Sequence, residues 1–462
     1  MRLVGRARVV LVILAAALVC AGGASAAPGW TEVTINASDA TPLACFYIIP
    51  GGTTPAGGWP GVILFHGLGQ SHTDVEPYGS ALAQFGFAAL ACDARGTGGS
   101  GGKFGLDGPR EVQDAQDLFN WFAARSDVSG TKIGALGFSL GGGEILNAAV
   151  AGVPFKAIVP AITWTDLGEA LNPNNVPKTG LLSQLYQLVA GSNWDPSLTQ
   201  MNHDLLAGNV TAAVKSAEAP RSSRSALHAL TVPTLMLQGR HDFLFDLDQA
   251  LAAYRLLAGP KQLYLGDLGH APAENPAAEQ PTYLLAVLHW FSHYLAAGSN
   301  PGGGVELGHD PWDGKVSTYQ GVPHTRHKVV NLPAKKKLTR PSASVRRSVR
   351  LTGGPLETFG DGSITVHYAG AAGSWPRLTA TVTVKGTAFP VTFGSALVTK
   401  PSGVLTIPLS DQAVLLPRGQ RLVVRVGGGT ADGVYAHAGG SGSITIRGIT
   451  LNLSLLKRAV SK

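Results

Sequence analysis

The sequence predicts a mostly parallel sheet covered by helices, followed by a separate antiparallel β-sandwich, and three observations support this. Before residue 298, short apolar runs such as "GVILFHG" and "KIGALGF" alternate with amphipathic stretches such as "REVQDAQDLFNWFAAR", as in parallel strands joined by helices. The segment "GSNPGGG" then has the composition of a linker. Beyond it, "RLTATVTVKG" and "QRLVVRVGGG" alternate polar and apolar residues between Gly-rich turns, which is typical of a sandwich.

Composition and charge agree with two globular domains. The 462 residues are 45% hydrophobic and 14% charged, which indicates a large buried core rather than a disordered chain. Residues 1–300 carry 16 Lys and Arg against 22 Asp and Glu, whereas residues 301–462 carry 20 against 7. An acidic first part and a basic second part indicate domains with different surfaces.

The first 27 residues have the features of an export signal. Arg2, Arg6 and Arg8 form a basic start, Val9–Val19 is apolar, and small residues precede a cleavage site after Ala26. The apolar run is shorter than the roughly 20 residues of a membrane-spanning helix. We therefore expect a secreted, extracytoplasmic protein, with a retained N-terminal anchor as the alternative.

The domain boundaries follow from these patterns. Residues 28–297 are predicted to form the catalytic domain, 298–345 a linker with a basic lead-in, and 346–462 the sandwich. About 65 residues separate two expected strands, "KAIVPAI" and "PTLMLQG", and they include helix-like stretches. An insertion of this length over the strand ends predicts a helical cap at about 165–230.

The motif "GFSLG" marks the candidate nucleophile, Ser139. It follows a buried apolar run and precedes the helix-like stretch "GGEILNAAV". Glycines two residues before and after the serine permit a sharp strand-to-helix turn that exposes the hydroxyl. The helix start offers N–H groups to a developing oxyanion. In this context the pattern predicts nucleophilic catalysis.

A serine nucleophile needs a base and an acid that orients the base. In such chains the acid follows the serine, and the histidine base follows the acid. "PTLMLQG" ends just before Asp242, and "KQLYLGD" ends just before His270. Asp242 is the predicted acid, with Asp246 as the fallback, and His270 is the predicted base. The adjacent His241 is expected to be a surface or packing residue.

The oxyanion hole requires two N–H donors. Leu140, directly after the nucleophile, is expected to supply one, and Leu68 in the "HGLG" loop the other. His66, which begins that loop, is expected to be structural because it precedes the nucleophile in the chain.

These motifs identify a resemblance. Residues 30–297 resemble an α/β-hydrolase, and "DARGTGGSGG" before a D…W helix and "GFSLG" resembles the X-prolyl dipeptidyl-peptidase and cocaine-esterase family. The resemblance implies an α/β-hydrolase fold with a C-terminal sandwich of jelly-roll type. The family usually has tyrosine where Leu140 stands and uses a tyrosine hydroxyl in the oxyanion hole, for which Tyr78 is not obviously placed. These departures favour an esterase over a proline-specific peptidase.

The hydrolase strand order also bears on the cysteines that remain after signal cleavage. It sets the expected second strand, which contains Cys45, antiparallel to the fourth strand, which ends at Cys92. Cys45 and Cys92 either form a disulfide or remain as two buried thiols.

Other functional classes are less well supported. Trp164 and Trp194 offer apolar surface for a substrate pocket in the cap. His289 and His293 have zinc spacing but lack the glutamate of H-E-x-x-H, so a packed helix is expected there. We expect no metal and no cofactor, and no nucleotide-binding glycine motif is present.

The sequence favours an exported serine hydrolase that cleaves a carboxylic ester, or an amide, through an acyl-enzyme. Its expected substrate is a small ester or a short peptide. An X-prolyl dipeptidyl-peptidase is the alternative, and a non-catalytic binding protein on a hydrolase scaffold is the alternative of another class. The basic sandwich either associates weakly with anionic cell-wall or membrane surfaces or packs against the acidic hydrolase domain. No nucleic-acid partner is expected.

Overall fold

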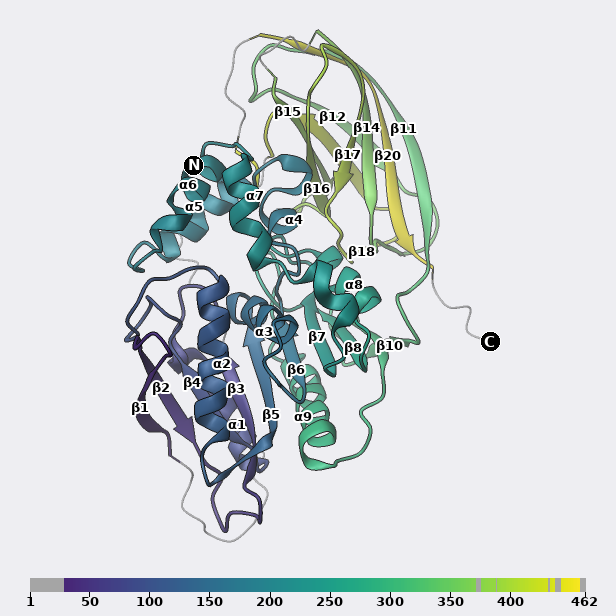
Figure 1. Ribbon diagram of the computed structural model, residues 1–462. Coiled ribbons are helices and arrows are strands. Elements are labelled where there is room, and N and C mark those ends of the chain that lie inside the picture. The colour runs from purple at the N-terminus through teal and green to yellow at the C-terminus, as the bar shows by residue number, and fades with distance from the viewer. Residues whose placement is uncertain (1–28, 371–374, 388, 431–432, 437–441, 458–462) are drawn as a thin grey trace.

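The computed structural model describes residues 29–370, 375–387, 389–430, 433–436 and 442–457. The predicted export signal, residues 1–27, lies outside the described residues. Figure 1 shows a sheet-and-helix domain below, a β-sandwich above, and the cap helices beside the sandwich.

The first domain is built on one ten-stranded sheet with the order β1-β2-β4-β3-β5-β6-β7-β8-β9-β10. Strands β4, β3, β5, β6, β7, β8 and β9 pair in parallel, and β1, β2 and β10 are antiparallel to their neighbours. The strands are β1 (Thr31–Asn36), β2 (Pro42–Ile48), β3 (Trp59–Phe65), β4 (Ala88–Cys92), β5 (Val128–Phe138), β6 (Ile158–Ala161), β7 (Thr234–Gly239), β8 (Lys261–Gly266), β9 (Gly304–Gly308) and β10 (Val316–Tyr319).

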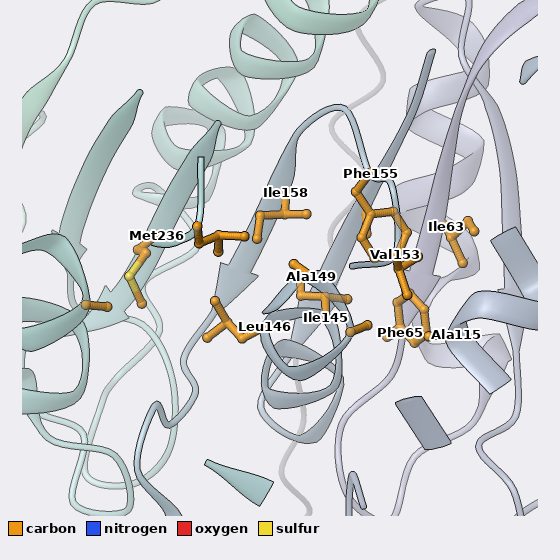
Figure 2. Close-up of a cluster of buried hydrophobic side chains, with 14 of the residues drawn as sticks. Ile63, Phe65, Ala115, Ile145, Leu146, Ala149, Val153, Phe155, Ile158 and Met236 are labelled. Carbon is orange, nitrogen blue, oxygen red and sulfur yellow. The ribbon is translucent and has the colours of Figure 1, made fainter. Parts of the chain in front are cut away.

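Helices cover both faces of this sheet, because its central strands are apolar on both sides. The helices are α1 (His72–Gln84), α2 (Pro109–Ala123), α3 (Leu140–Val150), α8 (Leu247–Leu256) and α9 (Gln280–Ala296). In β3, Ile63 and Phe65 face a core shared with α2, α3 and α8, whereas Val62 and Leu64 face one shared with α1 and α9. Figure 2 shows α3, through Ile145 and Leu146, within the first of these cores.

The predicted linker differs from the structure. Residues 298–345 were expected to connect the two domains, but β9 and β10 extend the hydrolase sheet to Tyr319. Val305 and Leu307 in β9 are buried against β8. Glycine and proline dominate the composition just before β9, so the sequence pattern there predicts a linker and does not reveal so short a strand. The sandwich begins at 325 rather than at 346.

A disulfide joins Cys45 and Cys92. The two residues are register partners on the antiparallel strands β2 and β4, with Cα atoms 4.0 Å apart. The strand order expected for a hydrolase thus brings these cysteines together, and the alternative of two free thiols does not apply.

The segment between β6 and β7 is mainly helical and stands in the place of the predicted cap, and its Trp194 forms an isolated β-bridge with Phe104. Its helices are α4 (Leu167–Leu171), α5 (Thr179–Leu188), α6 (Thr199–Leu206) and α7 (Ala212–Glu218), with 3-10 turns at η1 (Pro173–Asn175), η2 (Pro196–Leu198), η3 (Ala219–Arg221) and η4 (Arg224–Ala229). Their apolar faces form one cluster that includes Leu182, Met201 and Leu205. This cluster also contains Leu140, so the cap packs directly over the start of α3.

Two four-stranded antiparallel sheets form the C-terminal domain, with orders β11-β20-β14-β17 and β12-β19-β15-β16. The strands of these sheets are β11 (Thr325–Leu338), β12 (Ser344–Arg350), β14 (Gly362–Ala369), β15 (Arg377–Val384), β16 (Thr392–Leu397), β17 (Ser402–Leu409), β19 (Arg421–Gly427) and β20 (Ile444–Leu456). Two short strands, β13 (Leu356–Glu357) and β18 (Leu415–Leu416), pair with each other in a separate two-stranded sheet. Alternate residues of both sheets fill a separate core. The predicted fold class, an α/β-hydrolase followed by a sandwich, is confirmed.

Over the described ranges, no helix is both long enough and apolar enough to span a membrane.

Candidate active site

Ser139 stands on a strained turn between β5 and α3. Its φ is 54° and its ψ is −112°, a conformation that L-residues rarely adopt. A Cβ at Gly137 would lie 2.1 Å from the oxygen of Gly141, and one at Gly141 would lie 2.3 Å from the oxygen of Phe65. The two glycines of the motif are therefore required by close backbone approach, and the turn they permit carries the hydroxyl.

Three predicted residues meet above the carboxyl ends of β5, β7 and β8. His270 Nε2 lies 2.9 Å from Ser139 Oγ, and His270 Nδ1 lies 2.7 Å from Asp242 Oδ2. Because the carboxylate accepts from Nδ1–H, Nε2 is left to accept the serine hydroxyl proton. Side chains 131 and 28 residues apart in sequence thus form one continuous hydrogen-bond chain.

Asp242 is fully buried and fully hydrogen-bonded. Its Oδ1 accepts from the N–H groups of Leu244 and Phe245 at 2.8 and 2.9 Å, and its Oδ2 accepts from the N–H of His270 at 3.1 Å. The fallback acid, Asp246, instead accepts from Ser410 Oγ and the N–H of Asp411 in the sandwich. The structure therefore brings Asp242 to His270 and turns Asp246 away from it.

Two residues that sequence reasoning missed support the Asp242 loop. Lys178 of the cap donates from Nζ to the carbonyls of Phe243 and Leu244, each at 3.0 Å. Gln412 of the sandwich donates from Nε2 to the carbonyl of Asp242 at 2.8 Å. Burial lowers the pKa of the Lys178 ammonium, although nearby carboxylates oppose this shift. No local motif marks either residue, because both act on a loop distant in sequence.

His241 connects the loops that follow β7, β8 and β9. Its Nδ1 lies 3.2 Å from Asp267 Oδ1, and its Nε2 lies 3.2 Å from Asp310 Oδ2. Burial alone would lower the pKa of this imidazole, but hydrogen bonds to the two carboxylates raise it to about 9. His241 is therefore a charged structural bridge, where the sequence led us to expect a surface or packing residue.

The predicted oxyanion donors come from two loops that touch. The N–H of Gly141 donates to the carbonyl of His66 at 3.0 Å, which joins the start of α3 to the "HGLG" loop. His66 itself accepts from the N–H of Ala94 and donates to the carbonyl of Gly67, as expected for a structural residue. In the described part of the chain, neither Leu68 N–H nor Leu140 N–H has a hydrogen-bond partner, so both are free to bind an oxyanion.

The predicted pocket tryptophans differ in exposure. Trp164 is 3% exposed and its Nε1 donates to the carbonyl of Arg221. Its ring packs 5.2 Å from that of Phe245, which in turn lies 5.1 Å from His270. Trp194 is half-buried and packs on Phe104. Trp164 thus lies in the layer behind the site, and Trp194 lies on the cap side of the same apolar cluster.

Other predicted positions lie outside the site. Tyr78 packs its ring 4.7 Å from that of Phe138, and burial raises the pKa of its hydroxyl. On α9, His293 Nδ1 donates to the carbonyl of Gly298, so this imidazole is hydrogen-bonded to the backbone just after the end of the helix. Within the described ranges, no group of three or more His, Cys, Asp or Glu side chains has metal-site geometry.

The geometry suits one kind of chemistry. The Ser139 hydroxyl is hydrogen-bonded to the His270 imidazole, which is hydrogen-bonded in turn to the buried Asp242 carboxylate. The N–H groups of Leu68 and Leu140, in the adjoining loops, have no hydrogen-bond partner among the described residues. Such an arrangement favours acyl transfer, in which negative charge develops on a carbonyl oxygen beside the nucleophile.

Sequence comparisons agree with this assignment. Residues 65–272 match the profile of the X-Pro dipeptidyl-peptidase (S15) family. An uncharacterized 31.7 kDa protein of Escherichia coli from the traX-finO intergenic region is 31% identical over 134 residues, or 28% of this chain and 46% of that protein. The uncharacterized protein YcjY of Escherichia coli strain K12 is 30% identical over 143 residues, or 29% and 44%. The chain thus spans less than half the length of these relatives.

Solved structures are similar over nearly the whole chain. A CocE/NonD family hydrolase from Staphylococcus aureus has a TM-score of 0.70 at 14% identity, covering 91% of this chain and 93% of that one. An aminopeptidase from a marine sediment Thaumarchaeota archaeon has a TM-score of 0.66 at 13% identity, covering 93% and 97%. An α-amino acid ester hydrolase has a TM-score of 0.63 at 12% identity, covering 96% and 100%.

At these identities the structural likeness concerns the fold, and the family profile covers the segment that carries the three site residues. The chain has the α/β-hydrolase fold, and it resembles the X-Pro dipeptidyl-peptidases over residues 65–272 and the CocE/NonD-type hydrolases in its overall structure.

Proposed function

We propose that this chain is an exported carboxylic ester hydrolase that acts through an acyl-enzyme on Ser139. The observation that carries the proposal is the hydrogen-bond chain from Ser139 Oγ through His270 to Asp242, at 2.9 and 2.7 Å. Each distance is within the range for direct proton transfer between positioned groups.

In the first half-reaction, Ser139 Oγ attacks the ester carbonyl carbon while its proton passes to His270 Nε2. The N–H groups of Leu68 and Leu140 bind the resulting oxyanion. The carbon–oxygen bond to the alcohol then breaks, and His270 gives the proton to the departing oxygen. Asp242 stabilises the imidazolium throughout, because its buried carboxylate accepts from Nδ1–H.

Water completes the cycle by the same route. It loses a proton to His270, attacks the acyl carbon and displaces Ser139 Oγ, which recovers its proton from the imidazolium. The carboxylic acid leaves, and the enzyme returns to its starting state. The atoms balance as one ester and one water giving one acid and one alcohol.

Ester cleavage is favoured over proline-specific peptide cleavage by two departures at the site. Leucine stands at position 140, and a His-Gly loop supplies the second oxyanion donor in place of a tyrosine hydroxyl. Tyr78 lies against Phe138, and its hydroxyl makes no hydrogen bond within the described part of the chain. The match to the X-Pro dipeptidyl-peptidase profile keeps the peptidase as the second candidate.

Export is the remaining part of the proposal. A basic start, an apolar run and a small-residue cleavage site occupy residues 1–27. A disulfide between Cys45 and Cys92 also suits an oxidising compartment. Mass spectrometry of the protein recovered from outside the cells should show a new N-terminus at Ala27; recovery with residue 1 intact would contradict cleavage.

The substrate class is tested with two sets of chromogenic substrates. The purified protein, with Ser139→Ala as the matched control, is given p-nitrophenyl esters of graded acyl length and a proline-dipeptide p-nitroanilide. We expect turnover of the esters and little release from the anilide, with no turnover of either by the variant. A higher kcat/KM on the anilide would replace the esterase proposal with the peptidase. Ester turnover by Ser139→Ala would exclude Ser139 as the nucleophile.

A further inference from the structure

The glycine run after the nucleophile makes room for two residues that follow β6. Three consecutive glycines stand directly after Leu140, the first residue of α3. A Cβ at Gly142 would lie 2.7 Å from the Cβ of Thr163. One at Gly143 would lie 2.6 Å from the ring of Trp164. The segment just beyond β6 therefore packs directly against the first turn of the helix that starts at the nucleophile.

This segment also contacts the peptide groups on both sides of Ser139. The N–H of Ser139 donates to the carbonyl of Ala161 at 2.9 Å. The hydroxyl of Thr163 donates to the carbonyl of Ser139 at 2.7 Å. Between these two contacts, Ile162 has a φ of 46°, a conformation that β-branched residues rarely adopt. A strained position thus separates the two residues that hold the nucleophile.

The hydroxyl of Thr163 is a third donor to a carbonyl that is already satisfied. Within α3, the carbonyl of Ser139 accepts from the N–H groups of Gly142 and Gly143 at 3.0 and 3.1 Å. A carbonyl oxygen has two lone pairs, so the contact from Thr163, which is the shortest of the three, is not needed to satisfy it. Thr163 is itself fully buried, and burial of a hydroxyl has a free-energy cost. The contact therefore requires another explanation.

The carbonyl of Ser139 belongs to the peptide group that carries the N–H of Leu140, the predicted oxyanion donor next to the nucleophile. A peptide group is planar, with its C=O and N–H at opposite ends. A donor at the oxygen restricts rotation of this plane, and it also polarises the amide so that the N–H becomes a stronger donor. The hydroxyl of Thr163 thus acts on the oxyanion hole through one peptide group.

The second predicted donor, the N–H of Leu68, is supported in the same way. The carbonyl of its peptide group, that of Gly67, lies 2.8 Å from His66 Nδ1. His66 Nε2 accepts from the N–H of Ala94 at 2.9 Å, so Nδ1 carries the proton and donates to the carbonyl. Burial lowers the pKa of His66, which keeps the imidazole neutral. Each oxyanion peptide group therefore has a buried side-chain donor on its carbonyl oxygen.

We propose that Thr163 is a positioning residue of the oxyanion hole, which orients and polarises the N–H of Leu140 through the carbonyl of Ser139. This role rests on the proposed function, because an oxyanion forms only if Ser139 attacks a carbonyl carbon. It does not depend on the choice between ester and peptide substrates, since the oxyanion forms in the cleavage of both.

The test removes the hydroxyl and keeps the shape of the side chain. Thr163→Val is compared with Thr163→Ser, which keeps the hydroxyl, and with the matched control Thr234→Val. Thr234 is also buried, and its hydroxyl also donates to a backbone carbonyl, that of Val232, at 2.9 Å. It begins β7 and so lies at the end of that strand opposite the site. Both kcat/KM, on whichever substrate the wild type turns over, and the Ki of a trifluoromethyl ketone are measured.

The trifluoromethyl ketone reports on the oxyanion hole directly. Ser139 Oγ adds to its carbonyl carbon, the hydroxyl proton passes to His270 Nε2, and the carbonyl oxygen becomes an oxyanion. The Ki therefore follows the binding of the tetrahedral state. A threonine with a structural role alone would lower the melting temperature on substitution and leave this Ki unchanged.

We expect kcat/KM of Thr163→Val to fall by about tenfold, less than the loss of about 10²–10³-fold that follows removal of a direct oxyanion donor. The Ki of the ketone should rise by the same factor. Thr163→Ser should keep both values within about threefold of the wild type. Thr234→Val should lower the melting temperature to a similar extent as Thr163→Val, with unchanged kcat/KM and Ki.

Two results would overturn the role of Thr163. One is a Thr163→Val variant with the kcat/KM and Ki of the wild type, and the other is an equal loss in Thr234→Val. If Thr163→Val does not fold, Thr163→Ala and Thr163→Ser provide the same contrast, because both lack the methyl group and only serine keeps the hydroxyl. Equal kinetics in these two variants would contradict the role as well.

Fluorophosphonate labelling separates this failure from failure of the proposed function. If the wild type forms no adduct on Ser139, the proposed function itself is wrong. If the wild type forms the adduct and Thr163→Val has unchanged kinetics, only the role of Thr163 is wrong.

Discussion

The loop that carries Asp242 and the loop that carries His270 follow neighbouring strands, β7 and β8, yet they are held in different ways. The Asp242 side chain has no exposed surface, whereas 19% of the His270 side chain is exposed. The acid loop is fixed by the cap and the sandwich as well as by its own domain. The base loop is fixed by its own hydrogen bonds and by those to the acid loop, from His270 to Asp242 and from Asp267 to His241.

Contacts from three segments converge on the acid loop. Lys178 and Gln412 bind its carbonyls from the cap and the sandwich. Arg240, at its start, donates to the carbonyls of Ala413 and Gly308 and to the Glu357 carboxylate. The loop that carries the carboxylate is therefore held by residues of the cap, the sandwich and the sheet domain.

The base loop relies on fewer contacts. Asn275 accepts from the N–H of Gly269 and donates to its carbonyl, and the Phe245 ring lies against the imidazole. A base that receives a proton from Ser139 and gives it to a leaving group must adjust its position during the cycle. The comparison suggests that this fold immobilises the acid and leaves the base some freedom.

Exchange of the acid should have the largest effect. In Asp242→Asn the imidazole loses the carboxylate that selects its tautomer, and kcat should fall by about 10⁴-fold. Asp246→Asn is the matched control, because Asp246 faces Ser410, and it should keep most of the activity. Steady-state kinetics on a p-nitrophenyl ester measures both. A larger loss in Asp246→Asn would reverse the assignment of the acid.

His241 links the acid loop to the base loop, and the unfolding free energy that it contributes should depend on pH. The pKa of His241 is raised from 6.5 to about 9, so its contribution is fully present below about pH 6.5 and is lost as pH rises through about 9. The raised pKa corresponds to at most about 3 kcal/mol of unfolding free energy. Chemical denaturation of wild type and His241→Gln between pH 6 and 10 measures the difference. A constant difference over this range would contradict the bridge.

Removal of the buried ammonium should loosen the acid loop. Lys178→Met leaves the carbonyls of Phe243 and Leu244 without their donor, at a cost of about 1–3 kcal/mol. We expect a lower melting temperature together with a kcat that falls more than KM changes. Lys215→Met, on the exposed side of α7, is the control. If Lys178→Met is destabilised but its kcat is unchanged, Lys178 contributes to stability and does not position the acid for catalysis.

Loss of the sandwich contact should have the smallest effect. Gln412→Leu removes one hydrogen bond to the Asp242 carbonyl, worth about 1 kcal/mol. We expect a several-fold lower kcat, whereas Gln420→Leu, on the exposed turn before β19, should change nothing. If both variants match wild type, the sandwich does not position the acid.

Much of the site was predictable because its signals are local. "GFSLG" marks Ser139 by the glycines that its turn requires, and Asp242 and His270 each follow a recognisable strand. Their order along the chain then fixes the roles. The cysteine pair required one further step, since only the strand order brings Cys45 opposite Cys92.

The remaining features depend on tertiary packing. Lys178 and Gln412 lie in segments with no catalytic motif, and their partners are backbone carbonyls that a sequence does not distinguish. Strands β9 and β10 were missed because a Gly-rich stretch precedes a run of only five residues, Gly304–Gly308. Their pairing is specified by the exposed edge of β8, which becomes evident only in the folded sheet.

Covalent labelling of the nucleophile tests the central claim most directly. The protein is treated with a fluorophosphonate and the modified peptide is identified by mass spectrometry, with Ser139→Ala as the control. We predict a single adduct on the peptide that contains Ser139 and none on the variant. An adduct of equal yield on Ser139→Ala, or one on another serine of the wild type, would contradict the account.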